Sequence, residues 1–239
     1  MKKIFIFLII FFFETNVIAH TAHYKNFNKI EMDILKDGKK IGFCNYEFSW
    51  SAGNLQVKNI TEFEVKIMGI RVFSIQSNGT EVYKEDKLTM FKSETIQNKK
   101  KKYVSLKFQK NDNNYLIDGS SYKGIASLNN VVGNWWNHKI LTSKSQISPL
   151  SGSIKEQVVK FIKKENIIIN GKKYLAHKFT LKSKNPNLPE DKKLDFEIWL
   201  EPEKNLSHEF KSTEIFKASD LMVDSLTQLI SKIRSKKEN

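Results

Sequence analysis

Apolar and polar residues alternate along most of the chain after residue 28. Between residues 57 and 67 one phase is apolar, with Val57, Phe63, Val65 and Ile67. The other phase holds lysine and glutamate, and the same period of two recurs at 46–50, 103–109, 173–182 and 194–200. Successive side chains of a strand point to opposite faces, so this pattern predicts antiparallel sheets with one face against a core.

Turn-forming residue pairs separate these runs. They are Asp37-Gly38, Gly53-Asn54, Asp86-Lys87, Asp112-Asn113, Asp118-Gly119 and Asn170-Gly171. Asn-Gly and Asp-Gly adopt the positive φ angles that tight hairpins need. About eleven or twelve strands are therefore expected, and so many must curl or pack as two layers. The predicted fold class is all-β, an antiparallel barrel or strongly curved clamshell.

Two stretches break this rhythm. Residues 129–152 are rich in serine and asparagine, and we expect a short helix or compact loop near 132–141. At the other stretch, Ser219 is a suitable N-cap for an amphipathic helix over 219–234, whose apolar stripe is Leu221, Met222, Leu226, Leu229, Ile230 and Ile233. That helix either caps the open end of the barrel or lies on an anionic membrane surface.

The first nineteen residues have the pattern of a secretory signal peptide. Two lysines precede the apolar run Ile4–Phe13, which is too short to span a bilayer of about 30 Å. Cleavage is expected after Ala19 or after Ala22. The predicted organisation is a signal peptide at 1–19, a flexible mature N-terminus at 20–28, a β domain at 29–218 and a C-terminal helix with basic tail at 219–239. The expected location is the bacterial periplasm, with no transmembrane span in the mature protein.

The net charge and the kind of basic residue narrow the choice of partners. The formal net charge is +14, yet the basic residues are almost all lysine, with Arg71 and Arg234 the exceptions. Lysine lacks the planar fork with which arginine grips phosphate, and an exported protein meets little nucleic acid, so we expect no nucleic-acid partner. Lysines 99–102 suggest a solvated hairpin tip.

Cys44 stands alone, which excludes an intramolecular disulfide and favours a small buried apolar residue.

The tryptophan cluster is the strongest candidate for a binding site. Trp135 and Trp136 lie in the irregular stretch, followed by Asn137 and His138. One hypothesis makes them an apolar pocket mouth with two polar contacts, joined by Trp199 if that side chain faces a cavity. The other hypothesis is that one tryptophan plugs the interior and its neighbour lies on the rim.

No catalytic set or cofactor site is predicted. A remote possibility is copper held by His20 and His23, because an N-terminal amine and imidazoles suit Cu(II). His177 shares an apolar strand face with Leu175 and Phe179, which favours a core histidine over a metal ligand.

An ordered set of short motifs gives the chain a family resemblance. They are Asp33–Gly42, Phe63–Phe73, Glu81-Val82-Tyr83, Trp135-Trp136-Asn137, Leu150-Ser151-Gly152 and Asp195–Leu200. In this order they resemble an uncharacterised family of secreted bacterial β-proteins, a domain of unknown function, over roughly residues 30–217. The resemblance implies export and a mostly antiparallel β architecture. It implies no activity, so no catalytic residues follow from it.

These features favour a non-enzymatic exported protein that binds a hydrophobic or lipid-like ligand. The alternative is a cell-envelope assembly or scaffold protein that acts through edge strands and the basic C-terminal helix. A copper-dependent redox protein is the third and most remote hypothesis.

Overall fold

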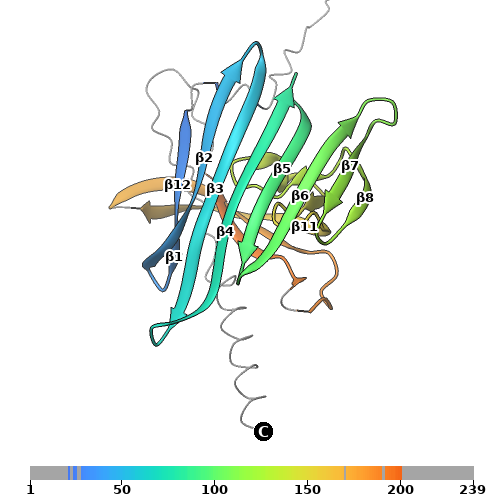
Figure 1. Ribbon diagram of the computed structural model, residues 1–239. Helices are drawn as coiled ribbons and strands as arrows, with labels where there is room; N and C mark the ends of the chain where they lie inside the picture. The colour runs from blue at the N-terminus through green and yellow to red at the C-terminus, as the bar shows by residue number, and fades with distance from the viewer. Residues whose placement is uncertain (1–20, 22–23, 26–27, 170, 190–191, 201–239) are drawn as a thin grey trace, which may run out of the picture.

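The computed structural model describes residues 21, 24–25, 28–169, 171–189 and 192–200. These residues form two β-sheets and contain no α-helix (Figure 1). The large sheet crosses the small one, which lies behind it in Figure 1. The predicted signal peptide at 1–19 and the predicted C-terminal helix with basic tail at 219–239 lie outside the described residues.

The large sheet is an eight-stranded antiparallel meander in which every strand pairs with the next. Its strands are β1 (Lys29–Lys36), β2 (Lys39–Ser51), β3 (Asn54–Ile67), β4 (Ile70–Lys84), β5 (Lys87–Gln97), β6 (Lys100–Gln109), β7 (Asn114–Gly119) and β8 (Lys123–Ser127).

The small sheet has five strands in the order β13-β12-β11-β10-β9. Its elements, with the 3-10 helix η2 between two of them, are β9 (Val131–Val132), η2 (His138–Leu141), β10 (Ser145–Ile147), β11 (Ile154–Ile169), β12 (Lys172–Ser183) and β13 (Asp195–Leu200). The β9–β10 pair is parallel, and the other pairs in this sheet are antiparallel.

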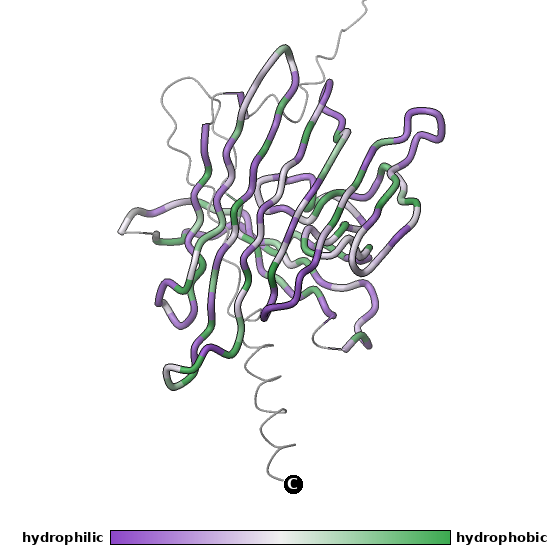
Figure 2. The backbone as a smooth tube through the Cα atoms, viewed as in Figure 1, coloured by the Kyte–Doolittle hydropathy of each residue, from purple (hydrophilic) through white to green (hydrophobic). Residues whose placement is uncertain are grey.

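The strands form where the period of two predicted them, because one phase is buried. In β3, for example, Leu55, Val57, Phe63 and Val65 are buried. Figure 2 shows the corresponding alternation of hydrophilic and hydrophobic positions along the strands. Two-residue turns with positive φ at both positions join β1 to β2 at Asp37-Gly38 and β3 to β4 at Met68-Gly69. Such turns match the twist of the flanking strands.

The segment between β8 and β11 packs against both sheets. Val132, Trp136 and Ile147 belong to the core of the large sheet. Ile140 belongs to the core of the small sheet, and Trp135 packs against both cores. This segment, residues 128–153, thus bridges the inner faces of the two sheets, and we call it the bridging segment.

The all-β, antiparallel prediction is confirmed, but neither sheet closes into a barrel. Closure is unnecessary because the small sheet and the bridging segment bury the inner face of the large sheet. The helix expected near 132–141 is limited to η2, preceded by β9 and a turn. The very short β9 and β10 bring the number of described strands to thirteen, above the expected eleven or twelve. Cys44 is buried and free, as predicted.

Candidate functional site

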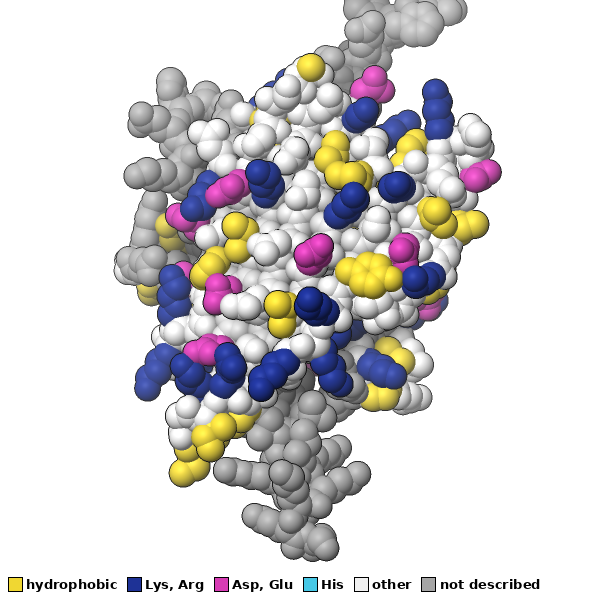
Figure 3. All heavy atoms as spheres, viewed as in Figure 1, with side chains coloured by type: hydrophobic (Ala, Val, Ile, Leu, Met, Phe, Trp, Pro, Cys, Tyr) yellow, Lys and Arg dark blue, Asp and Glu magenta, His cyan; other side chains and the backbone are white. Residues whose placement is uncertain are grey.

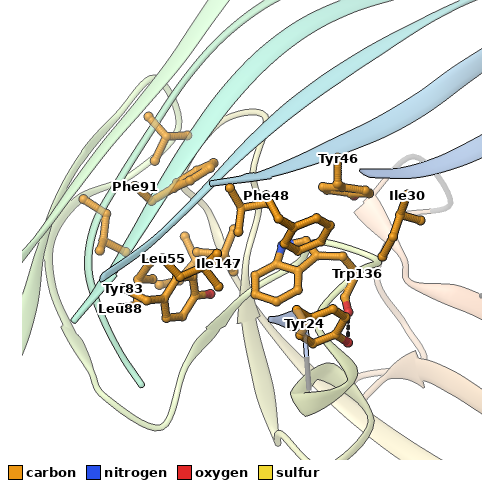
Figure 4. Packing of buried hydrophobic residues seen from close by; sticks show 14 of the residues in the cluster. Tyr24, Ile30, Tyr46, Phe48, Leu55, Tyr83, Leu88, Phe91, Trp136 and Ile147 are labelled. Atoms are coloured by element: carbon orange, nitrogen blue, oxygen red, sulfur yellow. Dashed lines mark hydrogen bonds between the residues drawn. The ribbon is translucent and has the colours of Figure 1, made fainter. Parts of the chain in front are cut away.

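Trp136 lies at the centre of the core rather than at a pocket mouth. Its side chain is 0% exposed. Three rings meet it edge-on, those of Tyr24, Phe48 and Tyr83, with centroid distances of 5.0, 5.5 and 5.6 Å. Figure 4 shows this cluster, with the Tyr24 hydroxyl bonded to the Trp136 carbonyl at 2.5 Å. Edge-to-face packing of this kind adds to the stabilisation from burial.

A buried carboxyl group accepts the indole N–H of Trp136. Glu81 lies on the inner face of β4, and Trp136 Nε1 donates to its Oε1 at 2.8 Å. Asn134 Nδ2 donates to the same oxygen at 2.6 Å. Tyr83 Oη donates to Oε2 at 2.6 Å and accepts from Asn137 Nδ2 at 3.3 Å. Every partner of the carboxyl group is therefore a donor, as an ionised glutamate requires.

Burial opposes the charge that these donors favour. Glu81 is 1% exposed, and this desolvation raises its pKa above the ordinary value, against the lowering effect of bonds from Tyr83, Trp136 and Asn134. Burial, together with the nearby carboxylate of Glu81, raises the pKa of Tyr83 well above its usual value. The network links β4 to the bridging segment, and all of its members are buried.

Sequence reasoning did not find Glu81 as a member of this site, although a signal was available. Glu81 falls in the same phase as Phe73, Ile75 and Tyr83 along β4. It stands in a row across the sheet that is otherwise apolar, namely Phe48, Val57, Phe91, Leu106 and Ile117. A carboxylate at a core phase is rarely buried without partners, so it pointed to donors elsewhere.

The other predicted residues of the segment are half-buried or serve as caps. Asn137 is buried, and its Oδ1 accepts the backbone N–H of Lys139 at 3.0 Å, which caps η2. His138 is half-buried, with Nδ1 3.3 Å from the Tyr24 hydroxyl. Trp135 is half-buried and packs on Phe196 with a centroid distance of 5.0 Å. The hypothesis that one tryptophan plugs the core and the other lies at the rim describes this placement.

Trp199 is not brought to the other tryptophans. It lies on the face of β13 opposite Phe196 and Ile198. Its Nε1 donates to Glu165 Oε1 at 2.7 Å, and Lys178 Nζ lies 4.8 Å from its ring centroid. Hydrogen bonds from Lys163 and Trp199 lower the pKa of Glu165. Trp199 therefore belongs to the polar outer face of the small sheet.

The inner face of the small sheet continues beyond its buried part as an exposed apolar strip. We define the apolar strip as Phe161, Leu175, His177 and Phe179. Phe161 pairs with Phe179 across β11 and β12, and its ring lies 5.8 Å from that of His177. Phe161 and Leu175 are 53% and 50% exposed. His177 is half-buried beside Phe161. The sequence predicted a core position for it, and the structure places it at the edge of the core.

A separate hollow of about 460 Å³ lies on the outer face of β2–β5. Its walls carry both signs of charge, from Glu62 and Glu64 against Arg71 and Lys99, together with apolar Phe63. This mixture matches neither an anion nor an apolar ligand, so we assign it no ligand.

The described part of the chain contains neither a metal-binding cluster nor a membrane-spanning helix. No group of three or more His, Cys, Asp or Glu residues there could hold a metal ion. His20 and His23, the predicted copper ligands, lie outside the described residues. Within the same part of the chain, no helix has the length and apolar character needed to cross a bilayer.

The chain belongs to the family described as Domain of unknown function (DUF6134), whose model matches residues 32–215. No curated protein and no solved structure matches the chain. The match confirms the predicted membership of an uncharacterised family, whereas bacterial origin and secretion stay predictions. Two motifs behind the predicted resemblance, Glu81-Val82-Tyr83 and Trp135-Trp136-Asn137, meet in the buried network.

Proposed function

We propose that the protein is an exported, periplasmic, non-enzymatic binding protein for an acidic lipid-like amphiphile held on the apolar strip. The observation that carries this proposal is the continuation of a buried core into exposed aromatic and aliphatic side chains. Leu181 and Ile198 are buried, and Phe179, Phe161 and Leu175 extend the same face outward. An acyl chain laid along this face would remove apolar area from water.

Basic residues beside the strip suit an acidic headgroup. Lys164 pairs with His177 across the two strands, so both side chains lie on the face of the apolar strip. A carboxylate or phosphate there would meet Lys164 while its chain covers Phe161. Trp135, half-buried against Phe196 at the covered end of this face, and the half-buried His138 three residues further on complete the site in the proposal. Trp136 and Asn137 hold the bridging segment in place.

A binding assay with oleate tests the proposal. Native mass spectrometry of the processed full chain should show a bound lipid-like mass, and oleate titration should quench tryptophan fluorescence. Phe161→Ser should weaken oleate binding at least about tenfold, because it removes a large apolar contact. The matched control is Val158→Ser, which changes an exposed apolar residue on the opposite face of the same strand.

The headgroup contact has its own test. Lys164→Glu should weaken oleate binding about tenfold at low salt, whereas Lys160→Glu, on the opposite face of β11, should leave it within about twofold. Oleate affinity that is equal in all four variants and the unmodified chain would refute the proposed site.

The envelope-scaffold hypothesis stays a prediction. It requires residues 219–239, which lie outside the described part of the chain, and exposed sheet edges. Loss of a captured partner on deletion of 219–239, in a chain that binds no oleate, would favour that hypothesis over the binding protein.

A further inference from the structure

One end of the large sheet gathers most of its basic turns. In a meander the chain reverses at each turn, so the β1–β2, β3–β4 and β5–β6 turns lie at the same end. We call the basic side chains of these turns and the adjoining strand ends the basic rim: Lys36, Lys39, Lys40, Lys66, Arg71, Lys99, Lys100, Lys101 and Lys102. Figure 3 shows Lys and Arg side chains in a row along the lower edge of this face.

The rim carries a surplus of positive charge. The acidic residues near it on and between β1 to β4 are Asp33, Asp37, Glu62 and Glu64. Asp118, beside the β7–β8 turn at the same end of the sheet, forms an ion pair with Lys123. Asp33 forms an ion pair with Lys40, Asp37 forms one with Lys36, and Glu64 forms one with Lys66.

Several rim lysines have no such neighbour. Lys39, Lys99, Lys100 and Lys101 form no ion pair with any residue that the structure describes. The turns at the other end of the sheet balance their lysines with Glu85, Asp86 and Asp112. The positive charge is therefore concentrated at one end.

An apolar hairpin tip projects from the middle of this rim. β3 pairs with β2 only as far as Phe63, and β4 pairs with β5 only from Ile75. Beyond these points β3 and β4 pair with each other alone, and they end in Met68, 86% exposed, and Ile70, 68% exposed. In Figure 1 this turn extends past its neighbours at the lower end of the sheet.

The tip is firmly held and its composition is not explained by the turn. Val65 and Phe73, which pair with each other three residues before Met68 and three after Ile70, are buried in a core cluster that packs the base of the ribbon. Met68 has φ 51° and Gly69 has φ 80°. Asn or Asp at the first position would suit this conformation and water better than methionine. An exposed apolar side chain at a strained position needs another reason.

We propose that this end of the large sheet docks on an anionic lipid bilayer. Met68 and Ile70 enter the boundary between headgroups and acyl chains, and the basic rim lies on the acidic headgroups. Apolar insertion and electrostatic attraction reinforce each other in this arrangement, as in other proteins that lie on a membrane surface. The proposal does not depend on the oleate site, which lies on the small sheet.

Co-sedimentation of the processed full chain with vesicles tests the docking. The chain should bind vesicles of phosphatidylglycerol mixed with phosphatidylcholine at low salt, and bind vesicles of phosphatidylcholine alone at least about tenfold more weakly. High salt should release it, because the headgroup contacts are screened.

Matched variants locate the contact. The double variant Met68→Asn with Ile70→Thr keeps a favourable turn and should lower vesicle affinity about tenfold. The triple variant Lys99→Gln, Lys100→Gln and Lys101→Gln should do the same, whereas Lys84→Gln, Lys87→Gln and Lys110→Gln, at the opposite end, should stay within about twofold.

Three outcomes would overturn the proposal. They are equal binding to neutral and acidic vesicles, vesicle binding that survives both the tip and the rim variants, and rim-dependent binding to soluble polyglutamate without any vesicle binding. The second would assign the membrane contact to another part of the chain, and the third would identify an acidic macromolecule as the partner. Oleate affinity should be unchanged in the tip variant, which separates this test from that of the proposed function.

Discussion

Glu81 carries a carboxyl group into a row of apolar side chains, and three donors, one on its own strand and two on the bridging segment, compensate for it. Tyr83 comes from the same strand, and Asn134 and Trp136 come from the bridging segment. A buried carboxylate without such donors would cost roughly several kcal/mol, so arrangements of the segment that withdraw these donors are disfavoured. We interpret the network as the contact that determines where the bridging segment lies.

The free energy of unfolding should depend on pH through Glu81. Its pKa is raised in the folded protein, so the folded state binds this proton more tightly than the unfolded chain does. The resulting stabilisation is complete below the unfolded pKa of about 4.3 and is lost as pH rises through the higher folded pKa, by about 1.4 kcal/mol per unit between the two values. Urea unfolding at a series of pH values measures this loss.

Glu81→Gln removes the titration while keeping the shape of the side chain. Relative to this variant, the unmodified protein should lose stability as pH rises across that window. Glu94→Gln, at an exposed position of β5, is the control for the loss of one carboxyl group. A Glu81→Gln curve parallel to that of the unmodified protein would show that Glu81 does not titrate there.

Trp136→Phe should destabilise the fold by about 3 kcal/mol. The substitution removes a donor to a buried carboxylate and leaves a small cavity among Tyr24, Phe48 and Tyr83. Denaturant unfolding measures the difference. Trp135→Phe, at a half-buried position, should cost about 1 kcal/mol, and a reversed order of the two values would contradict the assignment of Trp136 to the core.

The β3–β4 ribbon shows how an element can serve a purpose other than stability. Met68→Asn should raise the free energy of unfolding by about 0.5 kcal/mol, because Asn adopts positive φ at lower cost. Thermal unfolding measures the gain. A destabilised variant would mean that the Met68 side chain makes a stabilising contact in the folded protein.

The strands themselves follow from the sequence more fully than the turns do. The period of two located β3, β6, β12 and β13 because their inner and outer phases differ strongly in polarity. Asp37-Gly38 marked the first hairpin. Met68-Gly69 went unnoticed, since methionine is not typical of a turn and the apolar run continued through it.

The two sheets should unfold as one unit. Trp135 packs against both cores, and Ile140 and Trp136 from the same short segment belong to one core each. Cys44 alkylation reports opening of the large sheet, and amide exchange of β11–β13 reports the small one. Both should give the same free energy of opening, as expected for a cooperative domain. Exchange of β11–β13 at a clearly lower free energy, with Cys44 still protected, would show that the small sheet opens alone.

The order of alternating residues was enough to predict an antiparallel β protein, because burial of one strand face is a local property written into every second residue. The apolar character of a lone cysteine placed Cys44 in the core. The loss of alternation set residues 129–152 apart, although it did not reveal the two short strands β9 and β10 within them. The number of sheets, their open edges and the meeting of Glu81 with Trp136 depended on the tertiary structure. These features join residues that are far apart in the chain. Which donor meets which carboxyl group, and which apolar face covers which, depends on the groups that find no partner close to them in the sequence.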